Sequence, residues 1–118
     1  MKYALLIYSD PSVVDGLTNE EILARREEVM PKWLEWFEYL QQHAKSVEGR
    51  ELDEGTTAKT LRYENGEPVV TDGPFAETKE QIGGYLLIEC DNLDEAIDMA
   101  AHSPITARGS VEVRPVVE

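Results

Sequence analysis

The sequence has little cysteine and little positive charge, and both shortages restrict the classes of protein it can belong to. Its one cysteine, Cys90, has no partner within the chain for a disulfide bond. Lysine and arginine together number 11 against 24 aspartates and glutamates, which leaves a net charge of -13 at pH 7. This charge repels phosphate backbones and anionic lipid surfaces. We therefore expect no nucleic-acid partner and no membrane partner.

Long hydrophobic runs are also missing. The longest apolar runs are too short to span a bilayer, and no charged-then-apolar leader precedes the first strand pattern at residues 2–8. A cytoplasmic location is therefore expected. The 118 residues fit a single domain, residues 1–118, and a hydrophobic content of 42% is enough to form a core.

Two apolar segments predict strands that are covered on both faces, namely residues 3–8 (YALLIY) and 85–90 (YLLIEC). A final segment, residues 111–117, alternates valine with charged residues and predicts an edge strand. Between residues 58–63 and 68–71 the dipeptide Asn65-Gly66 predicts a peripheral hairpin.

A long amphipathic helix is predicted after the first strand. Thr18 stands before two glutamates and can cap the start of this helix. Apolar side chains then recur at helical spacing at Ile22, Val29, Trp33, Trp36, Leu40 and Val47. We expect Pro31 to kink the helix near residues 27–31 and Gly49 to end it.

A second, shorter helix is predicted after the strand at residues 85–90. Asn92 is its expected N-terminal cap and Pro104 its stop. Its expected apolar face consists of Leu93, Ala96, Ile97 and Ala100.

This order of elements predicts an α+β, ferredoxin-like split βαβ fold with an antiparallel sheet, in which the first and third main strands are central. Two helices cover only one face of such a sheet, whereas both central strands are apolar on both faces. A second copy of the chain is the simplest cover for the other face. We therefore expect a homodimer whose sheets face each other.

Residues 69–85 (VVTDGPFAETKEQIGGY) resemble the DGPF family within the YCII-related superfamily. The resemblance extends to the opening strand MKYALLIY, the tryptophan-bearing helix, the stretch LDEAIDMAAHSP and the ending GSVEVRPV. It implies a dimeric α+β barrel and, through the genes found beside DGPF members, a regulatory context near sigma factors of the extracytoplasmic-function class. The superfamily is presumed to use a His and Asp pair, but Trp33 and Ser103 stand at those two positions here.

Asp72 and His102 are the candidate catalytic residues. A carboxylate at Asp72 could act as a general acid or base, although Asp-Gly is also ordinary turn chemistry. His102 could shuttle protons, and it could equally serve as a helix C-terminal cap. The candidate ligand-binding residues are Gly73, Pro74, Phe75, Glu77, Lys79 and Trp33. Trp33 either lines a cavity between helix and sheet or fills the core.

Two functional hypotheses follow. One is an enzyme for a small organic molecule, with a pocket between the sheet and residues 72–80. The other is a non-catalytic dimeric module that binds a small molecule or a protein. No spacing matches a metal module or a phosphate loop, so neither a metal nor a cofactor is expected. Four cations are interpreted as surface ion-pair partners, any of which could anchor an acidic ligand: Arg25, Arg26, Arg108 and Arg114.

Overall fold

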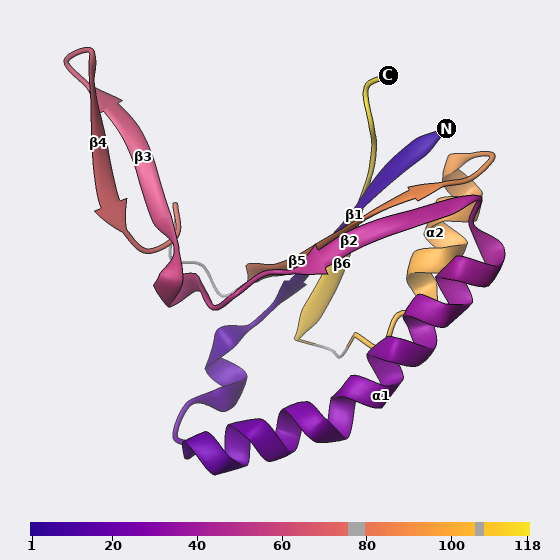
Figure 1. Cartoon of the computed structure of the whole chain (residues 1–118), viewed down its shortest axis with the longest axis horizontal. Helices are drawn as coiled ribbons and strands as arrows, with labels where there is room; N and C mark the ends of the chain where they lie inside the picture. Colours follow the sequence, from indigo (N-terminus) through magenta and orange to yellow (C-terminus); the bar gives the residue numbers. More distant parts are fainter. Residues whose placement is uncertain (76–79, 106–107) are drawn as a thin grey trace.

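The structure is a computed structural model, and it describes residues 1–75, 80–105 and 108–118. Its elements, labelled in Figure 1, are β1 (Lys2–Ser9), the 3₁₀ turn η1 (Pro11–Val14), α1 (Asn19–His43), β2 (Ser46–Glu51), the 3₁₀ turn η2 (Gly55–Thr57), β3 (Lys59–Glu64), β4 (Glu67–Asp72), β5 (Gln81–Glu89), α2 (Leu93–Ala101) and β6 (Gly109–Pro115). The predicted α+β, ferredoxin-like arrangement is confirmed.

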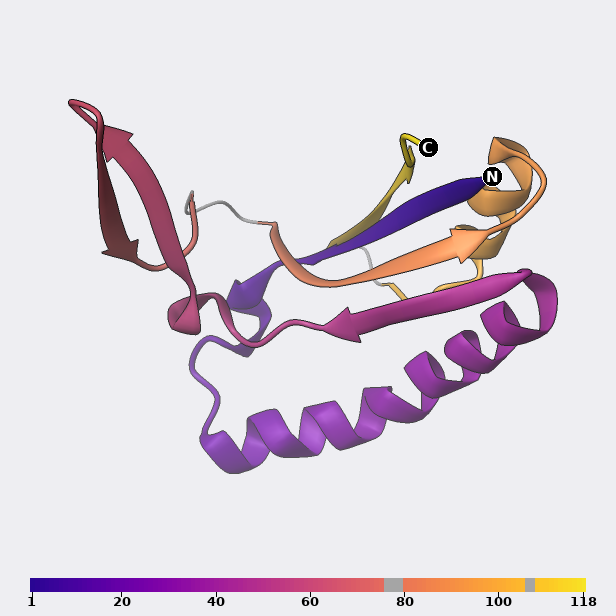
Figure 2. The ribbon, with the colours of Figure 1, turned by 45° about the horizontal axis from the view of Figure 1, so that its top comes forward.

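The main sheet is antiparallel, with strand order β2-β5-β1-β6, and β3 pairs with β4 in a separate two-stranded sheet. The two apolar segments therefore form the central pair, as predicted, and Leu5 of β1 lies opposite Leu86 of β5. Both helices lie on the same side of the main sheet (Figure 2). Its other side, which we call the outer face, is not covered by either helix.

The core lies where the C-terminal half of α1 and the helix α2 pack on the two central strands. Its described members are Tyr3, Leu5, Trp36, Leu40, Leu86, Ile88, Cys90, Ala96, Met99 and Ala100. The indole N–H of Trp36 donates a buried hydrogen bond to the carbonyl oxygen of Met99 at 3.0 Å. Apolar burial and this hydrogen bond together hold the two helices in one position relative to each other.

The helix α1 begins as its sequence predicts. The Thr18 hydroxyl accepts from the Glu21 amide at 3.1 Å, and the Glu21 carboxylate accepts from the Thr18 amide at 3.0 Å, which completes a capping box. The helix continues through Pro31, and its axis bends in the middle, so that its N-terminal half lies farther from the sheet than its C-terminal half (Figures 1 and 2).

The predicted end of this helix at Gly49 is wrong. The helix ends at His43, and Gly49 lies within strand β2, opposite Leu86 of β5. Val47 continues the helical spacing of the preceding apolar residues, which is why the sequence predicts that the helix reaches Gly49. The backbone of residues 46–51 instead pairs with β5 at the edge of the sheet. A β-carbon at position 49 would clash with the carbonyl oxygen of Tyr85. Glycine is therefore required at this position by the close approach of the neighbouring strand.

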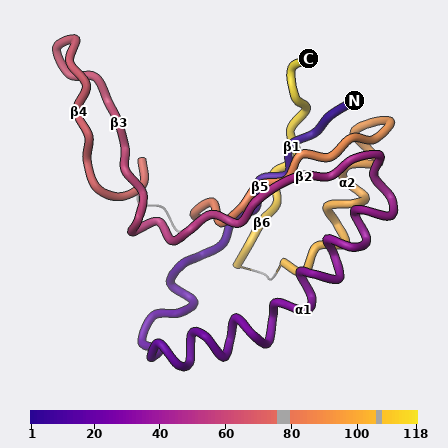
Figure 3. The backbone as a smooth tube through the Cα atoms, viewed as in Figure 1, coloured from indigo at the N-terminus to yellow at the C-terminus, as the bar shows by residue number. Residues whose placement is uncertain are grey.

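The hairpin β3–β4 confirms the prediction made from Asn65-Gly66. Both residues have positive φ angles, 52° and 81°, as a tight two-residue turn of this type requires. The hairpin projects away from the main sheet and from both helices (Figure 3). The radius of gyration is correspondingly 16.4 Å, whereas a compact domain of this size has about 13 Å.

The short helix α2 begins with the predicted cap, because the Asn92 side chain accepts from the Glu95 amide at 2.9 Å. Its predicted apolar face needs correction. Leu93 and Ile97 are exposed, and Met99 is buried together with Ala96 and Ala100. Which face of this short helix is buried depends on where the sheet and Trp36 lie. The sequence of the helix alone does not give those positions.

The contact at Gly49 generates a stability prediction. Gly49→Ala should lower the free energy of unfolding by about 1–3 kcal/mol, because the new methyl group can enter only if β2 and β5 separate. Gly83→Ala is the matched control, since its β-carbon would have Ser9 Oγ as nearest neighbour at 3.9 Å. Urea unfolding followed by tryptophan fluorescence measures both, and equal stability of the two variants would contradict the assigned strand contact.

Candidate functional site

A cavity of about 730 Å³ lies between α1 and the main sheet, on the side where the helix bends away. This volume is within the range of about 300–1,000 Å³ that holds small organic molecules. The cavity is bounded by residues from α1, from η1, from the start of β6 and from the neighbouring ends of β1, β2 and β5. It arises because only the C-terminal half of α1 packs directly on the central strands.

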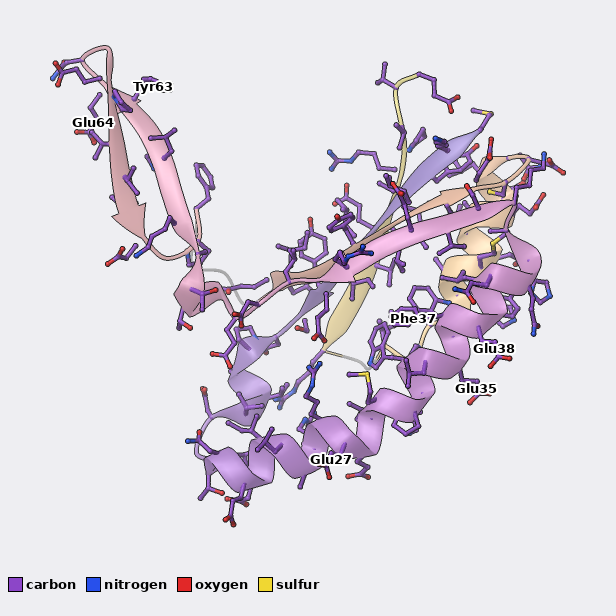
Figure 4. The ribbon with its side chains drawn as sticks, viewed as in Figure 1. Glu27, Glu35, Phe37, Glu38, Tyr63 and Glu64 are labelled. Carbon is purple, nitrogen blue, oxygen red and sulfur yellow. The ribbon has the colours of Figure 1, made fainter. Side chains whose placement is uncertain are left out.

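The interior of the cavity is apolar. Its lining includes Val29, Met30, Trp33, Phe37, Val47 and Leu86, all buried or half-buried. Trp33 and Phe37 belong to one aromatic cluster with Trp36, with ring centroids 5.6 to 6.3 Å apart. Figure 4 shows Phe37 pointing from α1 towards the sheet, whereas Glu35 and Glu38 point away from it. The predicted role of Trp33 as a cavity-lining residue is consistent with this geometry.

The rim of the cavity is charged. Three exposed arginines line it, namely Arg25, Arg26 and Arg108, together with the carboxylates of Asp10 and Glu51. Glu48 and Arg50 of β2 also border the cavity, but their side chains lie on the outer face of the sheet. Arg26 and Glu51 form a two-pronged ion pair, with N–O distances of 3.1 and 2.6 Å. The hydrogen bonds to the Glu51 carboxylate, together with its charge, raise the pKa of Arg26. This pair connects α1 to the end of β2 across the mouth of the cavity.

Asp72 does not line the cavity. It is the last residue of β4, and its exposed carboxylate forms an ion pair with Lys59 on the neighbouring strand β3. The next residue, Gly73, has a φ angle of 93° and donates its amide hydrogen to the carbonyl oxygen of Ala58 at 2.8 Å. Asp72 and Gly73 therefore form a turn at the base of the hairpin.

The residues after this turn fold back along the hairpin. Phe75 is exposed, its ring lies under the Arg62 guanidinium at 4.5 Å, and its carbonyl oxygen accepts a hydrogen bond from Arg62 at 3.1 Å. Pro74 lies between Gly73 and Phe75 and is half-buried. Glu77 and Lys79, which the sequence also proposes as ligand-binding residues, lie outside the described residues.

His102 caps the C-terminus of α2, which is one of the two roles expected for it. Its Nδ1 lies 2.8 Å from the carbonyl oxygen of Asp98, and its ring stacks on Tyr39 with centroids 4.4 Å apart. The helix α2 and the hairpin lie at opposite ends of the molecule (Figure 1). A single chain therefore does not bring Asp72 and His102 together.

The two positions at which the resemblance described above implies a His and an Asp, Trp33 and Ser103, are at or next to the cavity. Trp33 lines it directly, and Pro104, the neighbour of Ser103, lines it as well. Ser103 Oγ is buried and has no hydrogen-bond partner among the described residues. The sequence pointed to Trp33, and it presented Arg25, Arg26 and Arg108 as surface ion-pair partners that could also anchor an acidic ligand. The spacing of Arg26, Val29 and Trp33 along one helix face was the signal that could have linked charge and cavity.

No group of three or more His, Cys, Asp or Glu side chains in residues 1–75, 80–105 and 108–118 is placed to hold a metal ion. Within the same ranges, no helix combines the length and the apolar character needed to cross a membrane. Cys90 is buried in the core, and this burial raises the pKa of its thiol, so the residue behaves as a small apolar side chain.

The geometry of Asp72 generates a prediction about stability. The side chains of Lys59 and Asp72 are 64% and 87% exposed, so their ion pair is strongly screened by solvent. Asp72→Asn should change the free energy of unfolding by less than about 0.5 kcal/mol in urea unfolding. A loss several times larger would mean that the carboxylate has a structural role that the Lys59 contact does not explain.

Comparison with known proteins agrees with the fold and identifies the family. The family model for the YCII-related domain matches residues 1–118. An uncharacterized protein of Rhizobium meliloti (strain 1021) is 42% identical over 123 residues, which cover 98% of this chain and 92% of that protein. The chain therefore belongs to the YCII-related family.

Proposed function

We propose that this protein binds a small organic molecule in the cavity between α1 and the main sheet. The observation that carries the proposal is the combination of a volume of about 730 Å³, an apolar interior and a rim of charged side chains. A few polar groups around a mostly apolar concave site are the usual composition of small-molecule sites. The YCII-related family supports the location, because the positions of its presumed His and Asp correspond to Trp33 and Ser103.

Binding is proposed ahead of catalysis by Asp72 and His102. The two residues lie at opposite ends of one chain, and neither lines the cavity. Catalysis by this pair would require the two groups to come from different protomers. We also assign the chain to the DGPF branch of its family, on the motif Asp72-Gly73-Pro74-Phe75. In this proposal the motif shapes the base of the hairpin.

The proposed working form is a homodimer joined through the outer face of the sheet. The centre of that face is apolar and consists of Ala4, Leu6, Tyr8, Ile82, Tyr85 and Leu87. The edge strands carry charged residues on the same face, Glu48 and Arg50 on one side and Glu112 and Arg114 on the other. An apolar centre with a polar rim is the usual anatomy of a protein interface.

The hairpin supports the same dimer. A two-stranded hairpin is marginally stable in water by itself, and its apolar side chains Leu61, Tyr63 and Val70 are 55 to 71% exposed. The hairpin extends away from the four-stranded main sheet of its own chain (Figure 3). In the proposed dimer these side chains pack against the second protomer.

The cavity proposal is tested with a neutral apolar dye, N-phenyl-1-naphthylamine. The dye should bind the wild-type protein with increased emission, and Val29→Trp should abolish binding because the larger side chain fills the cavity. Leu34→Trp is the matched control, since Leu34 is on the same helix but 57% exposed. The proposal fails if the folded wild-type protein does not bind the dye, or if the two variants lose binding equally.

The dimer proposal is tested by placing a charge in the outer face. Leu87→Lys should give a monomer in sedimentation equilibrium, because a buried unpaired ammonium group opposes the contact between the sheets. Leu34→Lys should leave the dimer intact. Leu5→Lys is unsuitable because Leu5 is buried in the core of its own chain. A monomeric wild-type protein at micromolar concentration would contradict the proposal.

A further inference from the structure

The arginines of this acidic chain are concentrated at one place. The sequence has six arginines in a background of net charge -13, and four of the six border the cavity, although the side chain of one of them, Arg50, lies on the outer face of the sheet. Only three of the 24 carboxylates do so. A chain with this composition would be expected to surround a random cavity with carboxylates. Apart from Arg50 and Glu48, whose side chains lie on the outer face, three arginines and two carboxylates border this cavity.

The arginines have different surroundings. Arg26 is engaged by Glu51 through two hydrogen bonds. Arg50 donates to the carbonyl oxygen of the neighbouring Gly49 at 2.6 Å. Arg25 is exposed at the rim and forms no ion pair with any residue in the described ranges. Its guanidinium therefore has hydrogen-bond donors available to a ligand.

A second cation stands on another element around the same cavity. Arg108 directly precedes β6, whereas Arg25 is in the second turn of α1. The apolar side chains of Trp33 and Phe37 line the same space. A molecule bound there meets apolar surface along its body and positive charge at the rim. Of the two neighbouring arginines on α1, Arg26 is already paired with Glu51. Arg25 is therefore the arginine of this helix that can pair with the acidic group of a ligand.

We infer that the cavity takes an amphipathic organic anion, with an aromatic or aliphatic body against Trp33 and Phe37 and its acidic group at Arg25. This inference rests on the proposed function and adds the chemical class of the ligand. A planar guanidinium binds carboxylate, sulfonate and phosphate groups through paired hydrogen bonds. These acidic groups share one recognition chemistry, and the ring or chain attached to them supplies the apolar burial.

The experiment compares two dyes that differ in one acidic group. The probes are 8-anilinonaphthalene-1-sulfonate and its neutral counterpart N-phenyl-1-naphthylamine, titrated into the full chain under equal conditions. The sulfonate should bind wild-type protein more tightly. Arg25→Gln should weaken sulfonate binding about tenfold, as expected for loss of one charge-assisted contact, and should leave the neutral dye unchanged. Arg25→Lys should retain part of the sulfonate affinity.

Arg62→Gln is the matched control. It removes the same charge from the hairpin, where Arg62 contacts Phe75 away from the cavity. The inference is overturned if the sulfonate binds no more tightly than the neutral dye, if Arg25→Gln leaves its affinity unchanged, or if Arg62→Gln weakens it equally. In each of these cases binding of the neutral dye still supports the proposed function. Failure of both dyes to bind the folded protein contradicts the proposed function itself.

Discussion

The packing of Trp36 and Leu40 on the two central strands is the contact on which the rest of the structure depends. Both side chains are buried, and the Trp36 indole also joins α1 to α2 through the Met99 carbonyl oxygen. Removal of these apolar surfaces from water supplies the main driving force at this point. Because α1 is held at its C-terminal half and bends along its length, its N-terminal half overhangs the sheet. The cavity results from this geometry.

The charge of the protein has different consequences at different places. Over the whole surface, the excess of carboxylates disfavours polyanionic partners. At the cavity, the chain places Arg25, Arg26 and Arg108 around an apolar interior, and Arg26 connects α1 to β2 through Glu51. A small anion with an apolar body meets an attractive local field there even though the net charge is negative. Local geometry can therefore oppose the average composition.

Among the described residues, two apolar surfaces are left exposed to solvent. One is the outer face of the main sheet, and the other consists of the exposed side chains of the projecting hairpin. The proposed homodimer would cover both, with a second copy of the chain whose sheet is opposed to the first and whose own hairpin is extended. Removal of these apolar side chains from water is the free-energy gain that the proposed contact would provide.

The sequence by itself determined the elements whose signals are local. Asn65-Gly66 specified the hairpin, Thr18 and Asn92 specified helix starts, and the two apolar segments specified central strands. Each of these signals acts through turn geometry, capping or periodicity over a few residues.

Only the tertiary structure decided that residues 46–51 form an edge strand, that Met99 rather than Ile97 is buried, and that the arginines meet at one cavity. It also separated Asp72 from His102. Strand pairing and side-chain clusters of this kind join residues that are far apart in the sequence. A pattern within a few neighbouring residues therefore cannot predict them.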